Sequence, residues 1–215
     1  MEAQNMTHPF LELRDTDISY DNKIILEKIN FLFKPSSIYV LSGPSGIGKT
    51  SLMKTVSAHQ RPQKGQVLLN GKPHLTPSKS IFYIQQEDDL FDWLTVLGHI
   101  QLCQKQGGDL EEGLRLAKEL ELNADLHLYP SQLSLGMKKR LAILRALMMK
   151  PKILILDETL SSVETRLRDK IILLLEDWTK KTAAACIFVT HYPMDFQTAK
   201  VHRIKIQNKM LMEQD

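Results

Sequence analysis

Residues 43–50 read Gly-Pro-Ser-Gly-Ile-Gly-Lys-Thr and fit the pattern G-x-x-x-x-G-K-[ST] of a phosphate-binding loop. The apolar run 38–41 before them predicts a buried strand, and residues 51–56 after them predict the start of a helix. In that setting glycines let backbone N–H groups face phosphate oxygens, and the helix N-terminus adds partial positive charge. We expect Lys49 to reach the β- and γ-phosphates and the Thr50 hydroxyl to ligate Mg²⁺. An ordinary glycine-rich turn is the alternative, which the complete pattern disfavours. The nucleotide-binding candidates of this stretch are Gly43, Pro44, Ser45, Gly46, Ile47, Gly48, Lys49, Thr50 and Ser51.

A second candidate site lies at residues 153–158, where an apolar run is followed by Asp157 and Glu158. Continuous apolar runs are typical of strands buried on both faces of a parallel sheet, and ligands collect at the carboxyl ends of such strands. We therefore expect both acids beside the phosphate loop. Asp157 is placed to hold Mg²⁺ through water, and Glu158 to accept a proton from an attacking water. Two solvated acids at a strand end are the alternative.

The composition limits the class of protein. The 215 residues suffice for one α/β domain with a small inserted subdomain, and 43% hydrophobic residues are typical of a globular core. The net charge of +3 gives no reason to expect a nucleic-acid partner. No apolar run reaches the roughly 18 residues of a membrane helix, and we expect a chain that is not exported because its N-terminus lacks an apolar signal region. Cys103 and Cys186 are predicted to be reduced core thiols.

The hydrophobic pattern predicts an α/β fold with a mainly parallel central sheet and an N-terminal antiparallel β layer. The expected strands are 10–13, 18–20, 24–26, 29–33, 38–41, 67–69, 81–84, 153–156 and 186–189, followed by a hairpin over 203–212. Residues 87–149 turn helical and predict an inserted subdomain. In it Asp109 caps one helix, and Ser134 caps a longer one that ends at Met149 before Pro151. A further helix is expected around 164–181.

Residues 133–140, Leu-Ser-Leu-Gly-Met-Lys-Lys-Arg, decide among the proteins that carry such a phosphate loop. They resemble the ABC ATPase signature, usually L-S-G-G-Q, and stand upstream of the two acids. Other motifs follow in the order that the family has. Tyr20 is similar to the aromatic residue that stacks on adenine, and Gln86 is similar to the Q-loop glutamine. Residues 161–164 resemble the D-loop, and His191 resembles the switch histidine. With seven motifs in order over nearly the whole chain, the sequence is similar to the ABC transporter ATP-binding proteins.

Finer similarities point to a subgroup. Residues 90–96, Leu-Phe-Asp-Trp-Leu-Thr-Val, are similar to the L-x-P-W-x-T-V segment of nitrate, sulfonate and taurine importer ATPases. Residues 129–134, Met137 and Arg168 also resemble that subgroup, although related importers share parts of these features.

The resemblance implies the fold and the site of a P-loop NTPase of the ABC class, with residues 1–215 as one domain and 87–149 as its helical subdomain. It implies ATP as substrate and Mg²⁺ as cofactor. The implied catalytic residues are Glu158, His191, Lys49 and Gln86; the nucleotide-binding residues outside the phosphate loop are Tyr20, Ser134 and Gly136; the metal ligands are Thr50, Gln86 and Asp157.

The resemblance also implies partners. Two such subunits pair head to tail around two ATP molecules, here expected to be two copies of one chain, and Ser134 and Gly136 of one copy face the ATP of the other. Integral membrane permease subunits would receive the motion through residues around 87–105, with Phe91, Trp93 and Leu94 as candidate contacts. The chain would be cytoplasmic, on the inner face of the cell membrane, and would power import of a small solute. Nucleic acid is not expected, because Lys138, Lys139 and Arg140 are interpreted as a solvated helix face.

The sequence departs from the family pattern at four places. Leu135 replaces the first signature glycine, and its β-carbon is expected to restrict the backbone there and to weaken activity. Thr159 stands for a proline, Glu164 for the D-loop aspartate, and 36–37 lack a common glycine.

Alternatives remain at each level. Tyr20 is also compatible with a strand aromatic, His191 with a packed histidine, and Gln85 could replace Gln86 in the Q-loop role. The competing functions are a cassette that binds ATP without efficient hydrolysis or transport, and an ATP-driven module in repair or translation. An exporter is also compatible, and the substrate is not specified.

Overall fold

The computed structural model describes residues 11–86, 90–197 and 200–214, which form two sheets and the helices packed around them. The smaller sheet is antiparallel and has the strand order β2-β1-β4-β5. Its strands are β1 (Leu11–Tyr20), β2 (Lys23–Phe33), β4 (Lys64–Leu69) and β5 (Lys72–Pro73). The predicted segments 10–13 and 18–20 thus belong to one strand from Leu11 onward, whose pairing with β2 shifts register between Leu13 and Thr16.

The larger sheet has the order β10-β9-β3-β8-β7-β6, and the neighbours from β9 to β6 run parallel. Its strands are β3 (Ser37–Ser42), β6 (Ile81–Ile84), β7 (Ile153–Asp157), β8 (Ala185–Val189), β9 (Lys200–Gln207) and β10 (Met210–Gln214). β10 pairs antiparallel with β9 and forms the expected C-terminal hairpin. The carboxyl ends of β3, β7 and β8 therefore meet at one edge, which is where parallel sheets bind ligands.

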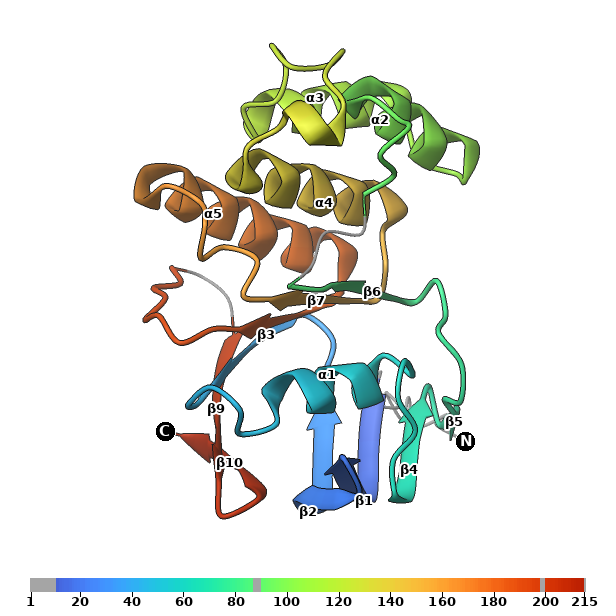
Figure 1. The fold of residues 1–215 in the computed structure, drawn as a ribbon, viewed down its shortest axis with the longest axis vertical. Coiled ribbons are helices and arrows are strands. Elements are labelled where there is room, and N and C mark those ends of the chain that lie inside the picture. Colours follow the sequence, from blue (N-terminus) through green and yellow to red (C-terminus); the bar gives the residue numbers. More distant parts are fainter. Residues whose placement is uncertain (1–10, 87–89, 198–199, 215) are drawn as a thin grey trace, which may run out of the picture.

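Helices cover both faces of the larger sheet (Figure 1). They are α1 (Lys49–Val56), α2 (Val96–Lys105), α3 (Leu110–Glu119), the short 3₁₀ helix η1 (Pro130–Gln132), α4 (Leu135–Met149) and α5 (Thr165–Thr182). α1 lies between the two sheets, α4 and α5 lie on the opposite face, and α2 and α3 lie beyond α4. Asp109 and Ser134 cap α3 and α4 as predicted, because their side chains accept hydrogen bonds from the third backbone N–H of each helix.

The core consists of two apolar clusters separated by the larger sheet. Alternate residues of β3 show the division: Ile38 and Val40 pack with α2–α5, whereas Tyr39 and Leu41 pack with α1 and the antiparallel sheet. One cluster runs without a break from the sheet through α4 to α2 and α3. The boundaries 87 and 149 of a helical subdomain therefore stay a prediction, since residue 87 lies outside the described residues and no separate core marks such a subdomain among the others.

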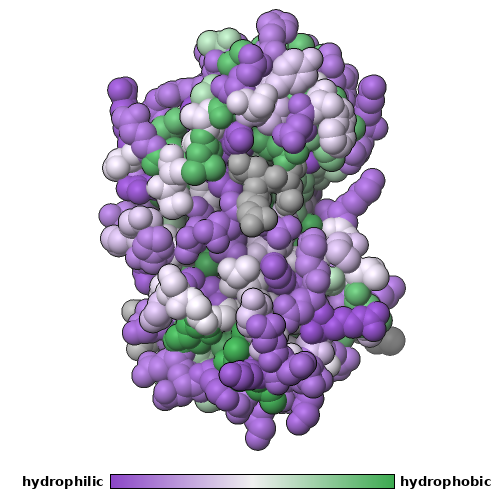
Figure 2. All heavy atoms as spheres, in the orientation of Figure 1, coloured by the Kyte–Doolittle hydropathy of each residue, from purple (hydrophilic) through white to green (hydrophobic). Residues whose placement is uncertain are grey.

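The surface differs from the core in hydropathy. The face in Figure 2 is mostly hydrophilic, and its hydrophobic residues are scattered in small groups. Both predicted core thiols are confirmed: Cys103 and Cys186 are buried and form no disulfide, and burial raises the pKa of the Cys186 thiol well above its ordinary value. No helix in the described ranges is both long enough and apolar enough to cross a membrane.

Candidate nucleotide-binding site

The predicted phosphate loop connects the end of β3 to the first residue of α1. Gly46 and Gly48 have φ angles of 77° and 109°, which only glycine adopts without strain. A β-carbon at Gly48 would also stand 3.1 Å from the Ile25 side chain. Ile47 packs against the core below and fixes the loop from underneath. The backbone therefore curves over the N-terminus of α1, as the glycine pattern predicts.

Lys49 lies under this loop. Its ammonium donates hydrogen bonds to the carbonyl oxygens of Gly43 and Pro44, at 2.7 and 3.0 Å, and the residue is 6% exposed. These carbonyl contacts hold the charge at the place where the phosphates of a nucleotide would enter.

Asp157 ends β7 and is almost fully buried beside the same loop. Its Oδ2 accepts a hydrogen bond from the Tyr83 hydroxyl at 2.9 Å, and the Thr50 hydroxyl also donates to this carboxylate. Burial raises the pKa of Asp157, while the two hydrogen bonds and the charge of Lys49 act in the opposite direction. Tyr83 was not among the predicted site residues, although its place on β6, three residues before Gln86, was a usable signal.

The residues around Asp157 fit a magnesium site. Mg²⁺ in nucleotide sites is held by one or two carboxylates, by waters and by substrate phosphates rather than by a protein cage. Asp157 and Thr50 provide a carboxylate and a hydroxyl in contact with each other. Among the described residues no group of three or more His, Cys, Asp or Glu could hold a metal ion alone.

Glu158 follows directly in a left-handed conformation, with φ of 49°. Its N–H donates to the carbonyl of Val189 at 2.9 Å, so the ends of β7 and β8 together fix this unusual turn. The Glu158 Oε1 lies 3.6 Å from Nδ1 of His191, whose ring contacts Tyr192 with a centroid distance of 4.0 Å. The two predicted catalytic side chains are therefore neighbours.

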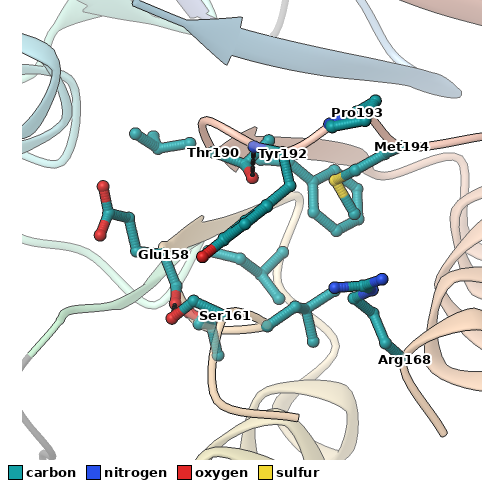
Figure 3. A pocket seen from close by; sticks show the side chains of 12 residues that line it. Glu158, Ser161, Arg168, Thr190, Tyr192, Pro193 and Met194 are labelled. Atoms are coloured by element: carbon teal, nitrogen blue, oxygen red, sulfur yellow. Dashed lines mark hydrogen bonds between the residues drawn. The ribbon is translucent and has the colours of Figure 1, made fainter. Parts of the chain in front are cut away.

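A small pocket lies beside Glu158, between the segment after β7 and the segment after β8 (Figure 3). Ser161 Oγ donates to the Glu158 carbonyl at 2.7 Å, and Thr190 Oγ1 accepts from the Tyr192 N–H at 3.0 Å. Figure 3 shows the Tyr192 side chain pointing toward Glu158 and Ser161. These bonds shape both turns, and neither Thr190 nor Tyr192 was among the predicted site residues.

One open groove collects most of the predicted residues. It is lined by Tyr20, Ile25, Ser45, Gly46, Gly48, Lys49, Thr50, Ser51, Gln86 and Glu158. Tyr20 is 63% exposed there, which suits a stacking platform better than a packed strand aromatic. Ser134 and Gly136 do not line this groove, because they stand at the N-terminus of α4.

The N-terminus of α4 corrects one expectation. Leu135 is the first residue of α4, lacks a positive φ and is 56% exposed. Its β-carbon therefore causes no conflict in this conformation, and the weaker activity expected from Leu135 stays a prediction. The steric demand falls instead on Gly136, where a β-carbon would lie 2.9 Å from the carbonyl oxygen of Ser162.

The interpretation of residues 138–140 as a solvated face is also wrong. Lys139 is 3% exposed, and its ammonium donates to the carbonyl oxygens of Gln85 and Gln86. Arg140 donates to the carbonyls of Leu120 and Glu121 at the end of α3. Helical periodicity did not reveal this, because both contacts are to backbone far away in sequence.

Comparison with known proteins decides the family. The family model described as ABC transporter matches residues 26–161. The chain belongs to the ABC transporter family.

Relatives in this family are longer than the chain. It is 30% identical over 215 residues to a spermidine/putrescine import ATP-binding protein of Nitrosomonas europaea, covering 95% of this chain and 58% of the relative. It is also 30% identical to a putrescine transport ATP-binding protein of Escherichia coli, covering 94% of this chain and 55% of the relative. The chain thus spans less than two thirds of these relatives.

Solved structures confirm the predicted ABC ATPase fold. An ATP-binding subunit of an ABC transporter superposes with a TM-score of 0.81 at 22% identity, covering 94% of this chain and 88% of that one. A dimeric ATP-binding cassette in a post-hydrolysis state, bound to ADP and Pi, has a TM-score of 0.81 at 23% identity. The match covers 95% of this chain and 97% of that one.

Proposed function

We propose that this chain binds and hydrolyses ATP as the nucleotide-binding subunit of a transporter that imports a small solute. The observation that carries the proposal is the groove that joins Tyr20, the phosphate loop, Gln86 and Glu158 above the buried Asp157. Family membership supports the same function.

The groove suits a nucleotide along its length. Tyr20 would stack on adenine at the exposed end. The backbone N–H groups of residues 43–48, the N-terminus of α1 and Lys49 would bind the phosphates. Lys49 would exchange its present carbonyl contacts for phosphate oxygens, which offer a full negative charge.

Thr50, Asp157 and Gln86 would hold Mg²⁺ at the phosphate end. When bound, this ion supplies neutralisation of the charge on the phosphates. Glu158, which lines the groove, would accept a hydrogen bond from an attacking water and take its proton. His191, 3.6 Å from Glu158, would orient that carboxylate or contact the γ-phosphate. The positive φ of Glu158 supports such a role, since strained residues persist where the surroundings fix them for function.

Ser134 and Gly136 fit a site completed by a second copy. They stand away from the groove of their own chain, at an exposed helix N-terminus suited to an anion. In a head-to-tail pair they would meet the γ-phosphate bound by the partner. ATP binding would then close the pair and hydrolysis would reopen it.

Transport requires membrane partners, which we propose to be integral permease subunits on whose cytoplasmic face this chain sits. The names of the relatives support import of a small solute, and polyamines are the substrate class that those names carry. The nitrate, sulfonate and taurine subgroup, based on residues 90–96 and 129–134, stays a prediction.

The alternative is a cassette that binds ATP without efficient turnover. Leu135 is the reason to consider this alternative, because its β-carbon was expected to restrict the backbone. The ordinary helical backbone at Leu135 weakens that reason.

The test compares ATP turnover with Mg²⁺ in the parent, in Glu158→Gln and in Glu111→Gln, which neutralises an exposed acid on α3. We expect loss of turnover only in Glu158→Gln, with ATP-dependent dimerisation kept. ATP binding without turnover in the parent, even with its permease, would favour the alternative. Absence of ATP binding would overturn the proposal.

A further inference from the structure

Lys139 is a charged side chain that the fold buries. It lies in the second turn of α4, five residues after Ser134, and is 3% exposed. Leu141 and Ala142, which follow on the same helix, belong to the apolar core. Burying an ammonium group is costly unless hydrogen bonds compensate for the lost water. A buried lysine at this position therefore needs an explanation beyond packing, because a methionine would fill the same volume.

The contacts of Lys139 give that explanation. Its ammonium donates to the carbonyl oxygens of Gln85 at 3.3 Å and Gln86 at 2.5 Å. Both residues directly follow the last residue of β6. The sheet fixes this segment on one side, and the ammonium fixes it on the other. Gln86 is thus held between the sheet and α4 at the point where it lines the nucleotide groove.

The two ends of this link carry different parts of the site. α4 begins at the signature residues Ser134, Leu135 and Gly136, and it packs against α2 and α3. The other end is the backbone of a residue on the groove of the same chain. A shift of α4 would therefore be transmitted to Gln86 through these charge-assisted hydrogen bonds, which are stronger than neutral ones.

We propose that Lys139 is a positioning residue, which fixes the Gln85–Gln86 backbone relative to α4 so that the Gln86 side chain is presented to the bound nucleotide. This inference rests on the proposed function. Lys139 does not line the groove and would act through Gln86.

The neighbouring lysine provides a matched control. Lys138 carries the same charge on the same helix, is only partly buried, and makes no side-chain hydrogen bond in the part of the chain that the structure describes. Lys138→Met therefore removes the same groups as Lys139→Met without touching the link.

The experiment measures the full chain as parent, Lys139→Met, Lys139→Arg and Lys138→Met. We expect kcat for ATP to fall between about 10-fold and 100-fold in Lys139→Met, as misplaced catalytic groups produce, with KM nearly unchanged. Amide hydrogen exchange of residues 81–86 without nucleotide should become faster, and the melting temperature should change little. Lys139→Arg keeps charged donors, so its kcat and its exchange rate should lie between those of the parent and Lys139→Met. Lys138→Met should match the parent.

Parental kcat and exchange in Lys139→Met would overturn the link, and so would equal losses in Lys138→Met. If Lys139→Met does not fold, Lys139→Gln keeps an uncharged amide donor and should show the same selective loss of kcat to a smaller degree; a parental kcat there would overturn the inference. A parent without turnover would instead count against the proposed function, and the exchange measurement would still test the link.

Discussion

Gly136 packs directly against the main-chain carbonyl of Ser162, so closely that a β-carbon would lie 2.9 Å from that oxygen. The first turn of α4 and the segment after β7 thus meet backbone to backbone within one chain. Ser161 hydrogen-bonds the carbonyl of Glu158 in the same segment. Glycine at position 136 therefore allows α4 to pack closely against the segment that follows Glu158.

Gly136→Ala should disturb this contact. Because backbone rather than a flexible side chain faces the new methyl group, the segment 161–164 must move, and overpacking of this kind costs about 1–3 kcal/mol of unfolding free energy. ATP turnover should fall in parallel. Urea denaturation and turnover measure both, and Leu135→Ala, on an exposed neighbour, should change stability by no more than about 0.5 kcal/mol. An unchanged stability in Gly136→Ala would show that the contact yields easily.

Leu135→Gly restores the residue that the family pattern has there. Because Leu135 already has an ordinary helical backbone, glycine adds freedom that this conformation does not use. We expect turnover to stay within about threefold of the parent, and unfolding free energy to fall by up to about 1 kcal/mol from the lower helix propensity of glycine. A tenfold or larger gain in turnover would mean that the leucine side chain itself obstructs the partner's nucleotide.

Tyr83→Phe removes only the hydroxyl that donates to Asp157. The bond is buried and its acceptor is a carboxylate, so its loss should lower the unfolding free energy by about 1–3 kcal/mol. Thr50 still donates to the same group, which favours the lower part of that range. Urea denaturation without nucleotide measures the change, and Tyr20→Phe, which alters an exposed ring, is the control. Equal stabilities of the two variants would show that the Tyr83 bond contributes nothing.

The sequence predicted the strands and helices that carry the site motifs, because each motif is local and stands at an element boundary. The phosphate loop and Asp157 needed only a strand end and glycines at fixed spacing. Lys139 could not be predicted, since its burial depends on the backbone of Gln86, more than fifty residues earlier. Ser36 illustrates a different limit: it has φ of 51°, so the turn that glycine would favour persists with serine, and residue type alone did not reveal it.

His99 gives a pH-dependent prediction. His99 is fully buried on α2. Its Nε2 accepts a hydrogen bond from the N–H of Phe91 at 3.0 Å, so the ring proton is on Nδ1. Nδ1 lies 2.9 Å from the carbonyl oxygen of Thr95. Burial lowers the pKa of His99, and the positive charge of Arg145 lowers it further, whereas the bond to Thr95 raises it. The neutral ring is therefore the form that the fold requires.

The direction of the pH dependence of stability follows from proton linkage. A histidine with a lowered native pKa binds more protons when unfolded, so its contribution to stability is intact above about pH 6.5 and is lost as the pH falls toward the native pKa. Urea denaturation between about pH 5 and pH 7.5 should show the parent losing stability on acidification more steeply than His99→Gln. His74, whose pKa burial also lowers, adds to the parental slope, so His74→Gln should reduce it separately. A His99→Gln variant with the full parental slope would show that protonation of His99 is not opposed by the fold.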